Sequence, residues 1–252
     1  FNDGHRRAVA LYPDTSQGNR IFAAWRHKWQ EHGGILIQSH AYDTSVSDHS
    51  QILRALFHLD HSDARRKALQ KTLDSTAQTK FLARRRQDID ALFLLGDNYQ
   101  IRLIKPQIDF HHAHDLVVYS LNSNYTGTND PVKDLDLEGI VFGDMPWVLN
   151  HGGSAQALRN RVPQQQSRRG TVLDRLFALG MDAYGLMHNI GEMERHPDLS
   201  YPGMTGDLTV TTTGRIQRRL EWFRIQRAKP VHLRLATLPT PPRLSLKSYS
   251  SD

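Results

Sequence analysis

The chain has 252 residues, 38% of them hydrophobic and 23% charged, which is enough for one large α/β domain or two lobes. It contains no cysteine, which excludes thiolate catalysis, cysteine-ligated zinc and disulfides, and its longest apolar runs, 91–96 and 116–121, fall far short of the ~20 residues of a membrane span. The net charge of +6 indicates acidic partners, but the arginine clusters are scattered and not interleaved with aromatic residues, which argues against a nucleic-acid-binding protein.

The first half of the chain alternates strands with helices. An apolar strand is predicted over 8–12, and a helix over 17–32 follows it with Ser16 as its N-cap. A second strand is predicted over 35–37. The further elements expected in this half are helices over 48–59 and 62–85, a strand over 90–95, a helix over 98–112 interrupted near Pro106, and strands over 117–121 and 139–142. This alternation predicts a mostly parallel sheet with helices on both faces.

The composition changes after Trp147. Residues 162–170 are polar and predict a mobile surface loop, and a long helix is predicted over 172–194 from apolar residues at helical spacing. Those apolar residues are Leu173, Leu176, Phe177, Leu179, Tyr184, Leu186, Met187 and Ile190. The remaining expected elements are strands over 208–212 and 220–226, with Gly214 as the turn residue between them, and a disordered tail over 239–252.

The chain shows no catalytic motif such as GxSxG. His111, His112 and His114 form the densest histidine cluster, but only the first and last can share a helix face, and no carboxylate stands at the spacing of a metalloenzyme motif. The cluster is equally typical of a solvated helix end. Asp88 and Asp90 could act as an acid/base pair, although aspartate is common in such turns for structural reasons. We therefore expect no metal and no cofactor.

Polar and aromatic side chains follow three of the predicted strands. In open parallel sheets ligands bind at the carboxyl ends of the strands. The ligand-cleft candidates at these ends are Ser16, Gln17, Asn98, Tyr99, Asn122, Asn124 and Tyr125. This composition is better suited to holding a polar ligand than to transforming one, and Ser16 is equally expected as a helix cap.

Several segments carry a family resemblance. The opening AVALYPDTSQGNRIFAAWRHKWQEHGG resembles the start of the second lobe in type I periplasmic binding proteins. More specific segments are ARRRQDIDALFLLGDNYQIRLIKPQIDF, VVYSLNSNYTG, LEGIVFGDMPWVL, ALGMDAYGLMHNI, GMTGDLTVTTTGRIQRRLEWFRI and KPVHL. In this order and at compatible spacing, over residues 8–233, they resemble the LppC family of penicillin-binding protein activators.

The resemblance implies a fold and a domain arrangement. It implies an α/β, periplasmic-binding-protein type I-like domain with two αβα lobes and mostly parallel sheets, of which this chain is a part. Residues 1–145 would lie mostly in the second lobe, and 146–238 would return to the first lobe and supply crossover strands. The family also carries an N-terminal lipidated cysteine and a helical-repeat region, and neither is present in this sequence.

The resemblance also implies a function. Members of the family are outer-membrane lipoproteins that bind a class A penicillin-binding protein, a bifunctional peptidoglycan synthase, and stimulate it without supplying a catalytic residue. We therefore expect a non-catalytic activator of peptidoglycan synthesis and cross-linking at the periplasmic face of the outer membrane. Peptidoglycan is a second candidate partner, nucleic acid is not expected, and membrane contact would require a lipid anchor that the sequence lacks.

The sequence also leaves two alternative functions open and points to a candidate partner surface. The first alternative is a periplasmic solute-binding or ligand-sensing protein of the same fold, because fold does not settle function. An uncharacterised enzyme is disfavoured by the lack of a nucleophile, metal or cofactor motif. The partner-surface candidates are Arg84, Arg85, Arg168, Arg169 and Trp147, the last being either a packing residue at a lobe hinge or an interface anchor.

Overall fold

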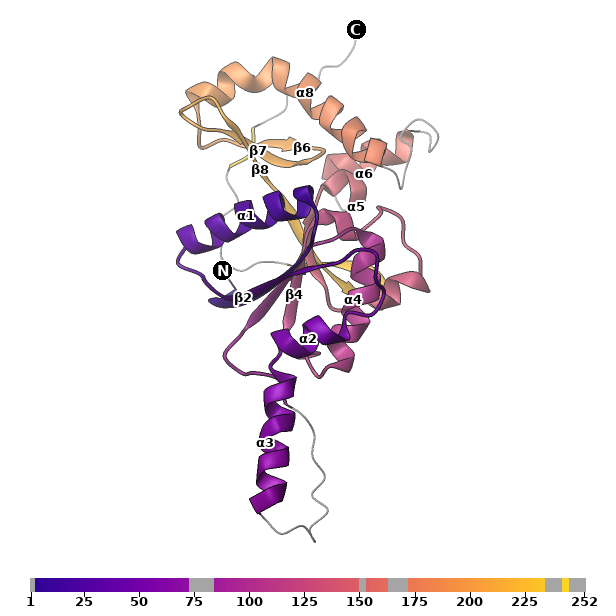
Figure 1. The fold of residues 1–252 in the computed structure, drawn as a ribbon. Helices are drawn as coiled ribbons and strands as arrows, with labels where there is room; N and C mark the ends of the chain where they lie inside the picture. Colours follow the sequence, from indigo (N-terminus) through magenta and orange to yellow (C-terminus); the bar gives the residue numbers. More distant parts are fainter. Residues whose placement is uncertain (1–2, 73–83, 150–152, 163–171, 234–241, 245–252) are drawn as a thin grey trace. The chain divides into compact units, whose positions relative to one another are not determined.

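The computed structural model describes residues 3–72, 84–149, 153–162, 172–233 and 242–244 (Figure 1). The chain divides into two compact units. Unit 1 comprises Phe1–Tyr125, Asn129–Phe142 and Arg224–Val231, and unit 2 comprises Thr126–Thr128, Gly143–Phe223 and His232–Asp252. Among the described residues, no helix is long and apolar enough to cross a membrane.

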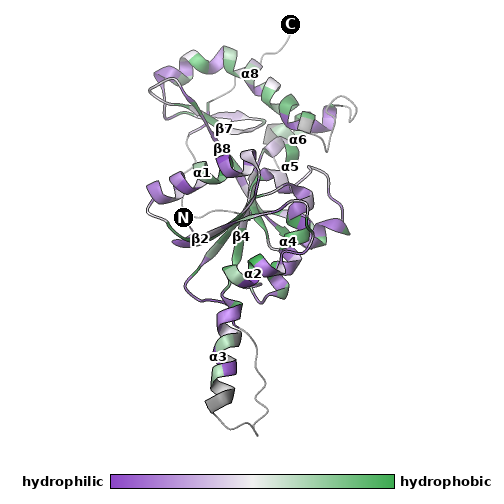
Figure 2. Ribbon diagram, viewed as in Figure 1, coloured by the Kyte–Doolittle hydropathy of each residue, from purple (hydrophilic) through white to green (hydrophobic). Residues whose placement is uncertain are grey.

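Unit 1 is built on a seven-stranded sheet of order β10-β9-β5-β4-β3-β1-β2, in which β1 to β5 run parallel. The strands are β1 Arg7–Pro13, β2 Ile35–Tyr42, β3 Ala91–Leu94, β4 Val117–Ser120, β5 Val141–Asp144, β9 Glu221–Gln226 and β10 Lys229–Leu233. Side chains from Ala8 to Leu11 are at most 2% exposed, because helices cover both faces of this part of the sheet. Hydrophobic stretches in the sheet, such as β4, are visible in Figure 2.

The order of the strands decides which face of the sheet each helix of unit 1 covers. They are α1 Ser16–Glu31, α2 Ser50–Leu56, α3 Leu59–Thr72 and α4 Asn98–Phe110. From β1 the chain moves outward to β2, then returns past β1 to β3 and continues to β4. Because parallel crossovers are right-handed, α1 lies on one face and α2 and α4 lie on the other. The aromatic rings of Tyr12 and Phe22 stack at 4.1 Å, and those of Trp25 and Phe93 at 4.3 Å, where α1 packs on the sheet.

Three sequence-based expectations for unit 1 need correction. The N-cap of α1 is Thr15, whose hydroxyl accepts from Gly18 N at 3.0 Å, and Ser16 is the first helical residue. The helix over 98–112 is not interrupted: α4 continues through Pro106. Packing of its isoleucines against the sheet outweighs the backbone hydrogen bond that proline removes. The long helix over 62–85 does not reach its expected end: α3 covers Leu59–Thr72, 73–83 lie outside the described residues, and residues 84–86 are not helical.

Unit 2 combines helices with a three-stranded antiparallel sheet of order β6-β7-β8. Its elements are α5 Pro146–Leu149, α6 Gly153–Arg161, α8 Val172–Arg195, β6 Tyr201–Gly203, β7 Gly206–Val210 and β8 Ile216–Arg219. Gly214, at φ +75°, turns the chain between β7 and β8. The predicted strand at 208–212 corresponds to β7, whereas the one at 220–226 is β9 and lies in the other sheet. The predicted loop at 162–170 falls, apart from Val162, outside the described residues.

The tail and the unit boundaries also differ from expectation. Within the predicted disordered tail over 239–252, residues 242–244 pair with Ser200: its N–H donates to Pro242 O at 2.9 Å, and its carbonyl accepts from Leu244 N at 2.9 Å. Leu244 is 7% exposed in the core cluster of unit 2, and burial of this leucine holds the segment in place. Apart from Thr126–Thr128, unit 2 begins at Gly143, and residues 224–231, expected in the returning segment, belong to unit 1. The assignment of the units to the lobes of a binding-protein fold stays a prediction.

Candidate functional site

The carboxyl edge of the unit 1 sheet has a topological switch point between β1 and β3, from which the chain turns in opposite directions. Ligands of open α/β sheets bind at this kind of position. Two of the polar side chains there are helix caps. Thr15 caps α1, and the carboxylate of Asp97 caps α4 by accepting from Gln100 N at 2.9 Å. The N-termini of α1 and α4 are therefore already supplied with acceptors from the chain itself.

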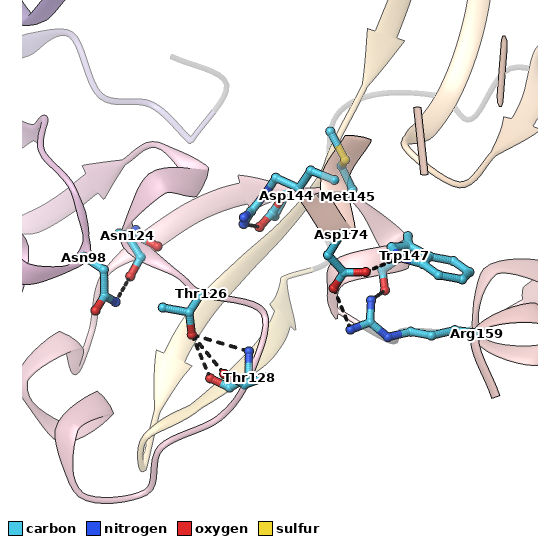
Figure 3. Close-up of polar contacts among 10 residues, drawn as sticks. Asn98, Asn124, Thr126, Thr128, Asp144, Met145, Trp147, Arg159 and Asp174 are labelled. Carbon is cyan, nitrogen blue, oxygen red and sulfur yellow. Dashed lines mark hydrogen bonds and ion pairs between the residues drawn. The ribbon is translucent and has the colours of Figure 1, made fainter. Parts of the chain in front are cut away.

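The loop after β3 is tied to the loop after β4. The side-chain amide of Asn98 donates to the backbone carbonyl of Asn124 (Figure 3), and Ser123 Oγ donates to Gly96 O at 2.7 Å. Asn124 lies in a single 3-10 turn, Asn122–Asn124, that directly follows β4. The structure thus brings together the candidates from α4 and from this turn.

Asn124 has an unusual environment. Its side chain is fully buried, and neither its Nδ2 nor its Oδ1 has a hydrogen-bond partner within the described part of the chain. A buried amide left in this way costs free energy unless water or a ligand pairs with it. Asn124 is therefore the candidate whose chemistry points most directly to a small polar partner.

The other cleft candidates lie in different environments. Tyr125 is buried, with its ring 5.8 Å from that of Phe142, and so packs in the core. Ser16 and Gln17 are exposed on the first turn of α1, and Tyr99 is 65% exposed. Asn122 is partly buried at the start of the turn that contains Asn124. Within this turn the backbone N–H of Tyr125 donates to the carbonyl of Asn122 at 3.3 Å.

Sequence reasoning missed the residues that shape this edge from β2. Tyr42, the last residue of β2, donates its buried hydroxyl to Leu95 O at 2.7 Å, and burial raises the pKa of this phenol well above its usual value. A Cβ on Gly96 would lie 2.5 Å from that hydroxyl, so only glycine fits between β3 and Tyr42. Gln100 on α4 donates to Thr44 O at 3.0 Å. The signal was available in the sequence, since Tyr42 ends a strand and faces the same edge as the other candidates.

Trp147, a partner-surface candidate, is fully buried in unit 2. Its indole N–H donates to Asp174 Oδ1 at 2.6 Å, and Arg159 donates to both the Trp147 carbonyl and Asp174 Oδ2, the latter at 3.0 Å (Figure 3). A second ion pair, Asp144 with Arg175 at 2.5 Å, lies beside the same helix α8. In the folded unit Trp147 therefore serves packing, and it is not exposed for contact with a partner.

The arginines predicted for the partner surface differ in their exposure and in whether the structure describes them. Arg84 is exposed. Arg85 is 8% exposed and donates to both oxygens of Asp115, at 2.9 Å and 2.6 Å, so it is committed to the fold where the sequence suggested a surface residue. Arg168 and Arg169 lie outside the described residues.

The histidines and carboxylates weighed as chemical groups lie in different environments. His111 is buried, whereas His112 and His114 are exposed. Asp90 accepts from the backbone N–H groups of Arg6 and Arg7 at 2.8 Å and 3.1 Å, and so ties the start of β1 to the start of β3. No group of three or more histidines and carboxylates in the described ranges is placed to hold a metal ion.

The sequence matches the family described as "LppC putative lipoprotein" over residues 1–228. The chain belongs to this family. Two curated relatives are the penicillin-binding protein activators LpoA of Vibrio antiquarius, 27% identical over 222 residues, and of Edwardsiella ictaluri, 27% identical over 237 residues. The alignments cover 88% and 90% of this LppC chain but only 36% and 34% of the relatives, so the chain spans about a third of their length.

Solved structures show the same fold. The C-domain of Haemophilus influenzae LpoA, described as a regulator of PBP1A, superposes with a TM-score of 0.61 and 19% identity over 92% of this chain and 63% of that one. A putative branched-chain amino acid ABC transporter protein of Rhodospirillum rubrum gives a TM-score of 0.58 at 16% identity, covering 92% of this chain and 61% of the other. The predicted fold class is confirmed: an α/β, type I binding-protein-like fold with a mostly parallel sheet.

Proposed function

We propose that this LppC chain is a non-catalytic activator of a class A penicillin-binding protein. The observation that carries the proposal is the family match over 1–228 together with relatives named as penicillin-binding protein activators. In this proposal the chain acts on peptidoglycan synthesis and cross-linking from the periplasmic face of the outer membrane, as part of a lipoprotein.

The chemistry of the described residues supports an activator over an enzyme. The buried carboxylates are engaged by arginines or by backbone N–H groups: Asp174 by Arg159, Asp144 by Arg175, and Asp182 by the N–H of Met204 at 2.6 Å. Such carboxylates stabilise a fold, whereas a general acid or base needs a nucleophile or a substrate within reach. An activator requires only a surface that the synthase recognises.

Direct binding tests the proposal. The purified chain is passed over the immobilised, detergent-solubilised class A synthase of the same organism, with a type I amino-acid-binding protein as the matched control of the same fold. We expect saturable binding of the chain and none of the control. Equal retention of both proteins, or of neither, would contradict the proposal.

A second candidate function, sensing of a small polar ligand, is favoured by one observation: the unpartnered, buried amide of Asn124. The neighbour from Rhodospirillum rubrum is described as a branched-chain amino acid transporter protein, so free amino acids are the first probes. We expect an amino acid that pairs with Asn124 to raise the melting temperature of the parent chain and not of Asn124→Ala. A panel of amino acids that leaves the parent's melting temperature unchanged would remove this candidate.

A further inference from the structure

Helix α3 projects from the rest of unit 1 (Figure 1), and its described buried side chains lie in its first turn. Leu59 and Ser62 are 1% and 5% exposed, whereas the side chains described beyond them are all exposed: Ala64, Arg65, Lys67 and Ala68. A helix of 14 residues is about 21 Å long and is marginal in water without tertiary packing. Because the side chains described beyond the first turn are exposed, packing against the core does not account for that part of the helix.

The base of α3 is nevertheless fixed. Arg85 is held by Asp115, as described above, and the backbone N–H of Arg86 donates to Phe57 O at 3.0 Å. The guanidinium of Arg86 also pairs with Asp88 at 2.7 Å. These contacts hold the chain on the C-terminal side of 73–83 against the body of unit 1, so the first turn of α3 departs from a rigid base.

Among the described residues of this feature, the exposed charge without an ion-pair partner is positive. Arg65 and Lys67 on α3 and Arg84 at its base are exposed, and none of them has an ion-pair partner among the residues that the structure describes. The acidic residue of the first turn, Asp60, is instead neutralised by Arg54 at 2.7 Å. Unpaired exposed cations on a projecting helix favour encounter with a negatively charged surface.

We propose that α3 and Arg84, together the basic arm, dock on an acidic face of the synthase. This inference rests on the proposed function and adds the surface through which it acts. The described exposed side chains of α3 contain no large apolar group, which disfavours insertion into a bilayer. The one aromatic ring among them is the imidazole of His61, which lies 5.0 Å from the ring of His58, so stacking on a nucleic acid or a similar polymer is disfavoured. A carboxylate-rich protein surface is the partner that this chemistry fits.

Charge reversal on the arm tests the inference. The association rate with the immobilised synthase is measured for the parent, for Arg65→Glu/Lys67→Glu and for Arg84→Glu. The matched control is Arg20→Glu/Arg26→Glu, which reverses two exposed arginines on α1 of the same unit. We expect both arm variants to associate about tenfold more slowly than the parent at low salt, and the control to match the parent within about twofold. The difference should shrink when salt rises from about 0.05 M to about 0.5 M.

The outcomes separate the arm from the proposed function. If the parent binds and the arm variants associate at the parent's rate, the arm proposal is wrong and the activator proposal stands. If the parent does not bind the synthase at all, both are wrong. If the variants lose binding to phosphatidylglycerol vesicles but keep the parent's rate with the synthase, the arm binds lipid and the protein-docking proposal is overturned. Melting temperatures equal to that of the parent show that the variants are folded, as exposure of these side chains predicts.

Discussion

Helices α4 and α8 are both amphipathic, yet α8 also buries two aspartates, Asp174 and Asp182, beside apolar side chains such as Met193. On α4 the inner face is apolar, and Ile101, Ile104 and Ile108 are all 0% exposed. On α8 the large apolar side chains with high exposure include Leu176 at 54%, Tyr184 at 67% and Met187 at 68%. Hydrophilic and hydrophobic residues alternate along α8 in Figure 2.

The inner face of α8 combines polar contacts with an apolar cluster that includes Leu186 and Met193. Asp174 pairs with Arg159 and Trp147, and Asp182 accepts from Thr205 N at 2.8 Å and from Thr205 Oγ1 at 2.5 Å. Burial of apolar surface is non-directional, whereas a buried ion pair stabilises a fold only when every member has its partner. The comparison teaches that unit 1 should tolerate conservative changes along α4, and that unit 2 should be sensitive to single polar deletions along α8.

Replacing Asp174 with alanine is expected to have the largest effect. The change leaves the guanidinium of Arg159 and the indole N–H of Trp147 buried without their acceptor, at a cost of about 4 kcal/mol in the free energy of unfolding. Urea denaturation measures the loss. Asp198→Ala, which removes an exposed carboxylate of the same unit, serves as the control and should change stability by less than about 0.5 kcal/mol. A loss below about 1 kcal/mol for Asp174→Ala would show that the polar face is dispensable.

Truncation on α4 is expected to be the next largest effect. Ile104→Ala removes a fully buried side chain and should cost about 3 kcal/mol, while Ile104→Val should cost about 1 kcal/mol. The same denaturation experiment gives both values. If the valine variant is as unstable as the alanine variant, shape rather than buried apolar area controls α4, and the contrast with α8 weakens.

A smaller effect is expected from the half-exposed pair of Asp88 and Arg86. Hydrogen bonds from Arg86 lower the pKa of Asp88 to about 2. Because the folded pKa lies below the unfolded value, the pair contributes stability above about pH 4, and this contribution is lost as the pH falls from about 4 to about 2. Asp88 is 43% exposed, so solvent screening limits the contribution to well under about 1 kcal/mol. Carboxyl NMR titration checks the pKa of Asp88. A value near that of a free aspartate would show that the pair with Arg86 does not contribute to stability.

The smallest effect is expected on the outer face of α8. Leu176→Ser and Met187→Ser alter side chains that are 54% and 68% exposed, so each should change the free energy of unfolding by less than about 0.5 kcal/mol. Leu186→Ser, on the buried side at 8% exposure, should cost several times more. Equal losses in the three variants would mean that the two faces of α8 do not differ as described.

The sequence predicted what depends on local periodicity and missed what depends on partners far away in the chain. The alternation over residues 8–142 predicted the parallel sheet, because each buried strand and helix repeats its own pattern. The continuity of α4 through Pro106 could not be predicted, since packing of its isoleucines against the sheet decides it. The same holds for Leu244, whose burial depends on the core cluster that it joins.

The candidate site shows the same difference between what local sequence predicts and what distant partners decide. Strand ends were sufficient to single out Asn98 and Asn124, which the structure connects. That Arg85 is buried depends on Asp115, and that Trp147 is buried depends on Asp174, and neither partner is adjacent in sequence. Residue type alone therefore offered Arg85 as a surface residue, and left packing and partner contact as two open interpretations for Trp147.

The central claim is that this LppC chain activates a class A synthase, and cross-linking measures it most directly. The synthase of the same organism is supplied with lipid II, and cross-linked muropeptides are quantified with and without an excess of the purified chain. The account predicts that the chain raises the rate of cross-linking, that Arg20→Glu/Arg26→Glu retains the stimulation, and that Arg65→Glu/Lys67→Glu reduces it. A cross-linking rate that is the same with and without the parent chain, although the two proteins bind, would contradict the account.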